Sequence, residues 1–198
     1  MTYGFMEKAV GSVLCTLIKK DITDKNIRKD IKQEYKEIMT RAKDIGQDNT
    51  LLSSYILCAF FIAMNRKDGF SAKENIDILE NRMRNSKLIK AFMGDSKSYF
   101  SDKKMQNRRE WSKNSYEKKY ENDWVVDFIE KTDEFDFGYD YRECGCCKLC
   151  RDENCPELAK YLCTLDYMLV DIMGIHLDRT MTLADGYDKC DFRFSLKK

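Results

Sequence analysis

The sequence predicts an α+β protein: a helical N-terminal half followed by a four-stranded, mostly antiparallel sheet packed with helices, in the order β-β-α-α-β-β. Apolar residues recur every three or four positions through the first hundred residues, which is the period of an amphipathic helix. From Asp123 onward, four short stretches alternate with period two, as strands do. Runs of strands beside helices, joined by short turns, indicate an α+β fold with an antiparallel sheet.

In the helical half, the second helix is predicted to begin after Thr23 or Asp24, both of which suit an N-cap, and to end at Gly46. The apolar run Leu51–Met64 is too short to span a bilayer comfortably, so we expect a buried core helix there. The stripe of the second helix consists of Ile27, Ile31, Tyr35, Ile38, Ala42 and Ile45.

A third helical segment is predicted from Ser71 to Gly94, because Ser71 followed by Glu74 forms a capping box. The stretch 96–122 is rich in lysine and dotted with aromatic residues, so it raises the alternative of RNA contact. Acidic residues interleave the basic ones, which favours an ordinary solvated helix.

The second half is predicted to hold strands over 123–130, 134–142, 176–184 and 190–196, with a long helix from Pro156 to about Met173. Asp185 and Gly186 suit a tight turn that joins the last two strands as a hairpin. Along the second strand, the side chains of Phe135, Phe137, Tyr139 and Tyr141 are expected on one face.

Composition narrows the class of partner. The 198 residues carry 35% charged side chains but a formal net charge of only +1, which argues against a nucleic-acid binder. The N-terminal stretch does not read as a signal peptide, and nine cysteines without one favour a reducing cytoplasm over a disulfide framework. We expect residues 1–122 and 123–198 to form one compact domain with a small-molecule partner and no membrane, and a homodimer stays open.

Five cysteines crowd into residues 143–156. Their spacing approaches the run that holds an iron–sulfur cluster in bacterial ferredoxins, and on paper four of them suit zinc. The last gap is too long for the ferredoxin run, and a helix over this segment would turn the thiols to different faces. We therefore expect no cofactor and treat the surplus thiols as small buried residues. If a metal is bound, its ligands would be Cys144, Cys147, Cys150 and Cys155.

The end of the chain is its most distinctive part. Cys163 and Asp166 lie three residues apart on the predicted long helix, so a thiol and a carboxylate share a face. The pattern C-x2-D-Y, then R-T-x-T-L-A-x-G and C-D-F-R-F, resembles the L-2-amino-thiazoline-4-carboxylic acid hydrolase family. The segment with Cys144 and Cys147 is similar to the one that precedes the family's helix, and the resemblance is clearest over residues 143–194.

The resemblance implies a hydrolase that acts on a C–N or C–S bond outside peptides and opens a small cyclic isothiourea to an N-carbamoyl cysteine. A thiolate would attack the carbon between nitrogen and sulfur while a carboxylate binds or protonates the exocyclic nitrogen. The catalytic candidates are Cys163, Asp166 and Cys190. The substrate-binding candidates are Arg179, Thr182, His176, Cys144 and Cys147.

Structural interpretations of the same residues stay open. His176 is predicted on the strand face opposite Leu177, where it would be an ordinary surface histidine, and Arg179 equally suits a surface ion pair. The alternative function is a non-catalytic module that binds a small ligand, or senses redox state or a metal, through its cysteines. A third possibility is an iron–sulfur or zinc protein that uses the 144–155 run.

Overall fold

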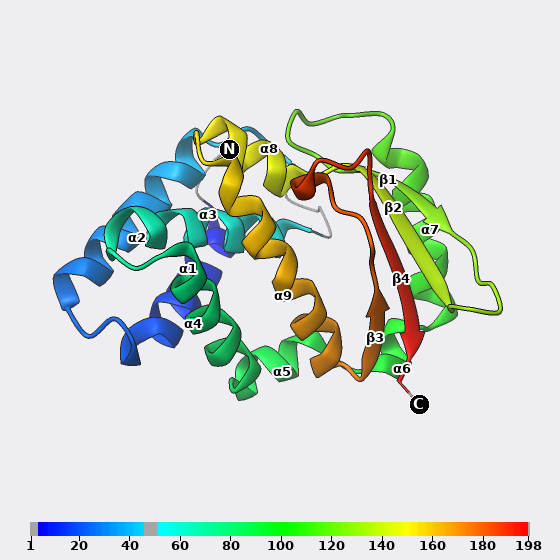
Figure 1. The fold of residues 1–198 in the computed structure, drawn as a ribbon, viewed down its shortest axis with the longest axis horizontal. Helices are drawn as coiled ribbons and strands as arrows, with labels where there is room; N and C mark the ends of the chain where they lie inside the picture. The colour runs from blue at the N-terminus through cyan, green and yellow to red at the C-terminus, as the bar shows by residue number, and fades with distance from the viewer. Residues whose placement is uncertain (1–3, 46–50, 198) are drawn as a thin grey trace.

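The computed structural model describes residues 4–45 and 51–197. It confirms the α+β class: helices of the first half pack beside an antiparallel sheet of four strands (Figure 1). The helices of the first half are α1 (Phe5–Leu17), η1 (Ile18–Lys20), α2 (Lys25–Arg41), α3 (Leu52–Lys67), α4 (Ala72–Arg84), α5 (Lys87–Met93), α6 (Ser96–Tyr99) and α7 (Asp102–Ser115).

The predicted helix starts hold, but one predicted helix is broken in two. Asp24 caps α2, and Ser71 with Glu74 forms the expected capping box at α4. The segment predicted as one helix from Ser71 to Gly94 divides after Arg84, because Ser86 caps a new helix, α5, by accepting a hydrogen bond from the Ile89 N–H. Gly46, the expected end of α2, lies outside the described residues.

The second half follows the predicted order of elements. It runs β1 (Val125–Ile129), β2 (Phe137–Glu143), α8 (Gly145–Asp152), η2 (Pro156–Leu158), α9 (Ala159–Ile172), β3 (Ile175–Asp178), η3 (Leu183–Asp185) and β4 (Cys190–Leu196). The strand order is β1-β2-β4-β3, and each neighbouring pair is antiparallel.

One face of the sheet is apolar and covered by helices. Register places Phe137, Tyr139 and Tyr141 opposite Phe194, Phe192 and Cys190, so these side chains share that face, whereas Phe135 precedes the strand. The opposite face carries charged residues, among them Asp140, whose carboxylate bonds Lys189 and Arg193. An antiparallel sheet with one solvated face shows this alternation.

The predicted strand over 176–184 is too long, and the tight hairpin is wrong. β3 ends at Asp178, and residues 179–189 leave the sheet before β4 begins at Cys190. The carboxylate of the buried Asp191 accepts hydrogen bonds from the N–H groups of Thr180 and Met181 and so holds this loop against the sheet. Those N–H groups are therefore not free to extend the ladder. Gly186 does form a turn, with φ of 89°, but inside this longer loop.

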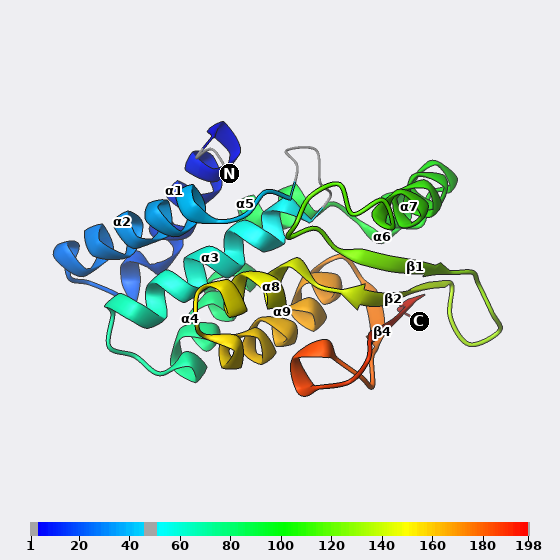
Figure 2. The ribbon, with the colours of Figure 1, turned by 90° about the horizontal axis from the view of Figure 1, so that it is seen from above.

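The polar segment 96–122 covers the apolar face with its aromatic residues instead of lying free in solvent. Helix α7 lies beside β1 (Figure 2). Its Trp111 ring meets Tyr139 edge-on, and the Ser112 hydroxyl donates to the Val126 carbonyl and accepts from the Phe128 N–H. A helix that bonds the backbone of edge strand β1 protects that edge from pairing with another chain.

Buried side chains from both halves form one hydrophobic core. Helix α3 is buried almost throughout, as predicted for the run that begins at Leu51. Among the described residues, no helix is long and apolar enough to cross a membrane. The core places α8 and α9 between the first-half helices and the sheet (Figure 1).

Candidate active site

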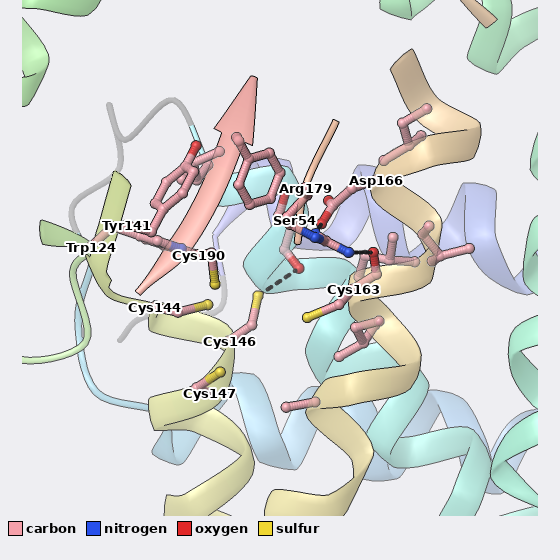
Figure 3. A pocket seen from close by; sticks show the side chains of 17 residues that line it. Ser54, Trp124, Tyr141, Cys144, Cys146, Cys147, Cys163, Asp166, Arg179 and Cys190 are labelled. Atoms are coloured by element: carbon pink, nitrogen blue, oxygen red, sulfur yellow. Dashed lines mark hydrogen bonds and ion pairs between the residues drawn. The ribbon is translucent and has the colours of Figure 1, made fainter. Parts of the chain in front are cut away.

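A cavity of about 110 Å³ lies between α3, α8, α9 and the apolar face of the sheet. Figure 3 shows thiols from α8, α9 and β4 turned toward it from different sides. Since one water needs roughly 10–15 Å³ of such space, the cavity admits only a ligand of modest size. Its lining includes Cys144, Cys146, Cys147, Cys163 and Cys190, with Asp166, Arg179, Ser54, Trp124, Tyr141 and Phe192.

An arginine–carboxylate pair occupies one wall. The guanidinium of Arg179 donates to Asp166 Oδ2 at 2.6 Å and to the Cys163 carbonyl at 2.8 Å. Aromatic rings of Tyr167 and Phe192 lie 4.9 and 4.8 Å from its central carbon, so the cation is fixed between them. Only 4% of the Arg179 side chain is accessible, and its Nε–H has no hydrogen-bond partner among the residues that the structure describes. A buried donor without a partner, beside a cavity, suits an anionic or carbonyl group of a ligand.

The pKa of the Asp166 carboxyl group lies closer to neutral pH than that of an ordinary aspartate. Burial raises its pKa, and although the Arg179 cation opposes this, the pKa rises from 3.8 to about 6. About a third of its side-chain surface remains accessible, and the residue lines the cavity. A carboxyl group with this pKa can exchange a proton with a bound ligand near neutral pH.

The loop 179–189 delivers Arg179 to the cavity. Asp191, the first residue after Cys190 in the strand, anchors the loop through Thr180 and Met181. The Leu183 N–H donates to the sulfur of Cys190 at 3.1 Å. These bonds join the R-T-x-T segment to the C-D-F segment.

Cys144 lies at the N-cap position of α8, and its sulfur faces the cavity (Figure 3). The thiols of Cys146 and Cys147, followed by their backbone N–H groups, interact with this sulfur and hold its pKa well below the usual 9.0. A thiolate is commonly stabilised at a helix N-terminus. Gly145 is required beside it, because a Cβ there would lie 2.5 Å from a backbone oxygen and 2.7 Å from the Trp124 ring.

The other two predicted thiols behave differently. Burial raises the pKa of Cys163 above its usual range, and the nearby Asp166 carboxylate adds to the rise. Burial also raises the pKa of Cys190 to about 12, despite the Leu183 N–H. At neutral pH both are neutral thiols, so their chemistry is that of wall residues or weak proton donors.

The structure does not bring two of the predicted binding residues into this cavity. His176 is exposed on the polar face of the sheet, where it pairs with Asp178 at 3.2 Å. Thr182 is buried in the loop and accepts a hydrogen bond from the Asp185 N–H, so it shapes the loop. Cys150 and Cys155 are buried and are not part of the lining.

The metal alternative can be compared with the positions of the ligands. Within residues 4–45 and 51–197, no three His, Cys, Asp or Glu side chains gather in a way that could hold a metal ion. The proposed set divides: Cys144 and Cys147 lie at the cavity, while Cys150 and Cys155 lie behind it. A tetrahedral zinc or iron–sulfur site would need all four sulfurs at one point.

Sequence reasoning missed the aromatic wall and one thiol. Trp124, Tyr141 and Phe192 line the cavity, although the alternation of the strands placed Tyr141 only on a buried face. Cys146, which seemed surplus, lines the cavity as well and donates to the Ser54 carbonyl at 3.6 Å. The signal that could have found them is in the sequence: the apolar positions of the second strand are followed directly by the cysteines that begin at Cys144.

The fold and this site define a class of α+β protein in which a small cavity, bounded by helices and one face of a sheet, combines thiols with an arginine–carboxylate pair. The chain belongs to the L-2-amino-thiazoline-4-carboxylic acid hydrolase family, whose model matches residues 18–194. The match extends well beyond the C-terminal motifs into the helical half. Comparison with curated proteins and with solved structures gave no significant match.

Proposed function

We propose that the protein opens a small cyclic isothiourea, or a related cyclic amidine, by hydrolysis. The observation that carries the proposal is the meeting of three groups at one small cavity: the Cys144 sulfur, the Asp166 carboxyl and the Arg179 guanidinium. The family to which the chain belongs is named for this kind of ring opening. A cavity of about 110 Å³ suits a compact ring better than an extended substrate.

Cys144 is the nucleophile in this proposal. The helical spacing of Cys163 and Asp166 made Cys163 the first choice, but its raised pKa leaves little thiolate at neutral pH. The sulfur of Cys144 has a lowered pKa and lies at a helix N-terminus. Cys163 and Cys190 then serve as neutral walls around the reacting carbon.

The chemistry proceeds in two steps that balance. The Cys144 thiolate attacks the ring carbon between nitrogen and sulfur, the bond from that carbon to the ring sulfur breaks, and the departing sulfur takes a proton from Asp166. Water then attacks the same carbon and gives one proton to the Asp166 carboxylate and the other to the former ring nitrogen, so that Cys144 departs as a thiolate. The Cys144 sulfur leaves, and the product is an N-carbamoyl thiol. A covalent intermediate of this kind divides one difficult substitution into two easier ones.

Asp166 and Arg179 have separate roles. With a pKa of about 6, Asp166 supplies both protonation states close to neutral pH, as general acid–base catalysis requires. In this proposal Arg179, whose buried Nε–H has no hydrogen-bond partner within residues 4–45 and 51–197, binds a substrate carboxylate or an oxygen that develops during water attack. Arg179 also keeps Asp166 oriented through the 2.6 Å bond.

The test is turnover of 2-amino-thiazoline-4-carboxylate followed by product chromatography, with matched cysteine variants. Cys144→Ala should reduce kcat/KM by about a thousandfold or more, whereas Cys163→Ala should reduce it less than about tenfold. Cys15→Ala, far from the cavity, is the control. An acid-quenched sample of the wild-type protein should carry the substrate on the tryptic peptide 143–148.

Two results would count against this assignment. If Cys163→Ala is the inactive variant, the nucleophile is Cys163 after all. If the wild-type protein binds cyclic isothioureas but leaves them intact, the non-catalytic ligand-binding module is the better description.

A further inference from the structure

The cysteines that the proposed reaction does not use form a row with the ones that it does. Cys146 and Cys150 stand one helical turn apart on α8, and the thiol of Cys58 in α3 donates to the Cys146 carbonyl oxygen at 3.7 Å. The sulfurs of Cys58 and Cys150 are 3.7 Å apart, and both residues are fully buried. Cys146 and Cys144 are two residues apart in sequence and line the same cavity. We call Cys144, Cys146, Cys58 and Cys150 the thiol row.

The row connects two different environments. Cys144 and Cys146 line the cavity, so a small oxidant that enters it can reach them. Cys58 and Cys150 are at 0% exposure in the core and do not line the cavity, so an oxidant in solvent cannot reach them directly. Oxidation can arrive at the inner pair through sulfur-to-sulfur exchange along the row.

We propose that the thiol row is a disulfide relay, which moves oxidation from Cys144 at the cavity to the buried Cys58–Cys150 pair. Its co-reactant is a hydroperoxide small enough to enter the cavity. The relay rests on sulfur contacts and burial, and it does not depend on the hydrolysis proposed above.

Each step balances in atoms and electrons. The Cys144 thiolate attacks the hydroperoxide, the O–O bond breaks, and a sulfenic acid and an alcohol or water result. The Cys146 sulfur then displaces water from that sulfenic acid and forms a Cys144–Cys146 disulfide. Cys58 attacks the Cys146 sulfur and releases Cys144 as a thiolate. Finally, Cys150 attacks the Cys58 sulfur and releases Cys146, which takes up a proton.

The net result is that the inner pair loses two hydrogens to the hydroperoxide while the cavity cysteines return to their reduced form. A sulfenic acid that is not resolved is open to further, irreversible oxidation. The relay would therefore preserve the thiol at the cavity during exposure to peroxide. The ordinary alternative is that Cys58 and Cys150 are only small packing residues, as buried cysteines often are.

Trypsin makes the relay measurable, because Arg142, Lys148 and Arg151 separate the thiols. Cys144, Cys146 and Cys147 fall in peptide 143–148, where fragmentation of the peptide distinguishes them; Cys150 falls in peptide 149–151, and Cys58 falls in peptide 44–66. The reduced full-length protein is treated with one equivalent of hydrogen peroxide, quenched with acid and N-ethylmaleimide at intervals, and digested for mass spectrometry.

In the wild-type protein, an internal disulfide in peptide 143–148 should appear first and then give way to a cross-link between peptides 44–66 and 149–151. In Cys150→Ala the first disulfide should persist about tenfold longer or more, and sulfinic acid at Cys144 should rise. Cys58→Ala should behave in the same way, and it is the variant to use for this test if Cys150→Ala does not fold. Cys15→Ala should match the wild type.

Oxidation that stays in peptide 143–148 of the wild-type protein would overturn the relay, as would Cys150 and Cys58 variants that behave like the wild type. The inner cysteines would then be packing residues. Because the readout is the position of the disulfide, the relay can fail while the hydrolase proposal stands, and the reverse is equally open.

Discussion

The Arg179–Asp166 pair at the cavity and a second group of charges behind α8 are built from the same residue types, but their burial is reversed. The second group, which we call the charge network, consists of Glu34, Arg41, Arg66, Lys67 and Glu153. In the network the carboxylates are the buried members, at 11% and 6% side-chain exposure, and the cations reach solvent. At the cavity the arginine is buried at 4%, and the carboxylate keeps 36% of its surface accessible.

Burial and neighbouring cations act on both carboxylates, but the pKa of one falls and the pKa of the other rises. At Glu34 burial raises the pKa, but hydrogen bonds from Arg66, Lys67 and Arg41 outweigh it, so the pKa falls below 4.5. At Asp166 burial is again the largest influence on the pKa, and one arginine is not enough to offset it, so the pKa rises to about 6. Several cations stabilise the ion of a structural carboxylate, whereas one cation leaves a carboxylate able to take a proton.

The largest difference should appear when one arginine is removed from each group. Arg179→Met should lower kcat/KM by at least about a hundredfold, because it removes the donor at the cavity and the partner that orients Asp166. It should also destabilise the fold by about 1–3 kcal/mol near neutral pH, since a partly buried carboxylate loses its cation. Kinetics and urea unfolding measure the two effects.

Arg66→Met is the matched control. Glu34 keeps Lys67 and Arg41 as partners, so the expected loss of stability is about 1–2 kcal/mol with kcat/KM unchanged. A fall in kcat/KM as large as that of Arg179→Met would mean that the network is part of the site.

Removing the charge of each carboxylate should separate activity from stability. Asp166→Asn should reduce kcat by about a hundredfold or more, because an amide cannot exchange the proton. Glu34→Gln should leave kcat unchanged and lower the free energy of unfolding by about 1–2 kcal/mol. Asp166→Asn with wild-type kcat would exclude Asp166 as the general acid.

The pH dependence of stability should have opposite signs in the two groups. The folded-state pKa of Asp166 is raised from 3.8 to about 6, so the folded protein binds a proton that the unfolded chain has released between these values. The stability from this group is present below pH 3.8 and is lost as the pH rises through 6. After allowance for the accessible third of the side chain, the loss is at most about 1 kcal/mol.

Glu34 has the lowered pKa, so its contribution is present above 4.5 and is lost as the pH falls through the folded-state value. Urea unfolding across pH 3–7 should show the slope between pH 4 and 6 flattened in Asp166→Asn, and the slope below pH 4.5 flattened in Glu34→Gln. If Asp166→Asn keeps the wild-type slope, another group titrates in that range.

The smallest effect is expected at His176. This side chain is exposed and pairs with the exposed Asp178, so His176→Ala should change stability by less than about 0.5 kcal/mol. It should leave KM within about twofold of the wild-type value. A tenfold rise in KM would return His176 to the substrate-binding set that the sequence predicted.

Local signals in the sequence were sufficient for much of the fold. Short-range rules predicted the caps at Asp24 and Ser71, the buried helix α3, and the alternation of β2 and β4, because each depends on neighbours within a few residues. They failed at residues 179–184, where an alternating pattern looked like a strand. The carboxylate of Asp191, ten or more residues away, takes the backbone N–H groups that a strand would have used.

The sequence by itself determined the α+β class, the family-like motifs and the pairing of Cys163 with Asp166 on one helix. Only the tertiary structure decided that the thiol of Cys144 has a lowered pKa while those of Cys163 and Cys190 have raised ones, since this depends on neighbouring sulfurs and on burial. It also brought Cys58 of α3 to within 3.7 Å of Cys150, a contact between residues 92 positions apart. Spacing along a chain reports which side chains share an element, whereas burial and charge at a site come from elements that meet only in the folded protein.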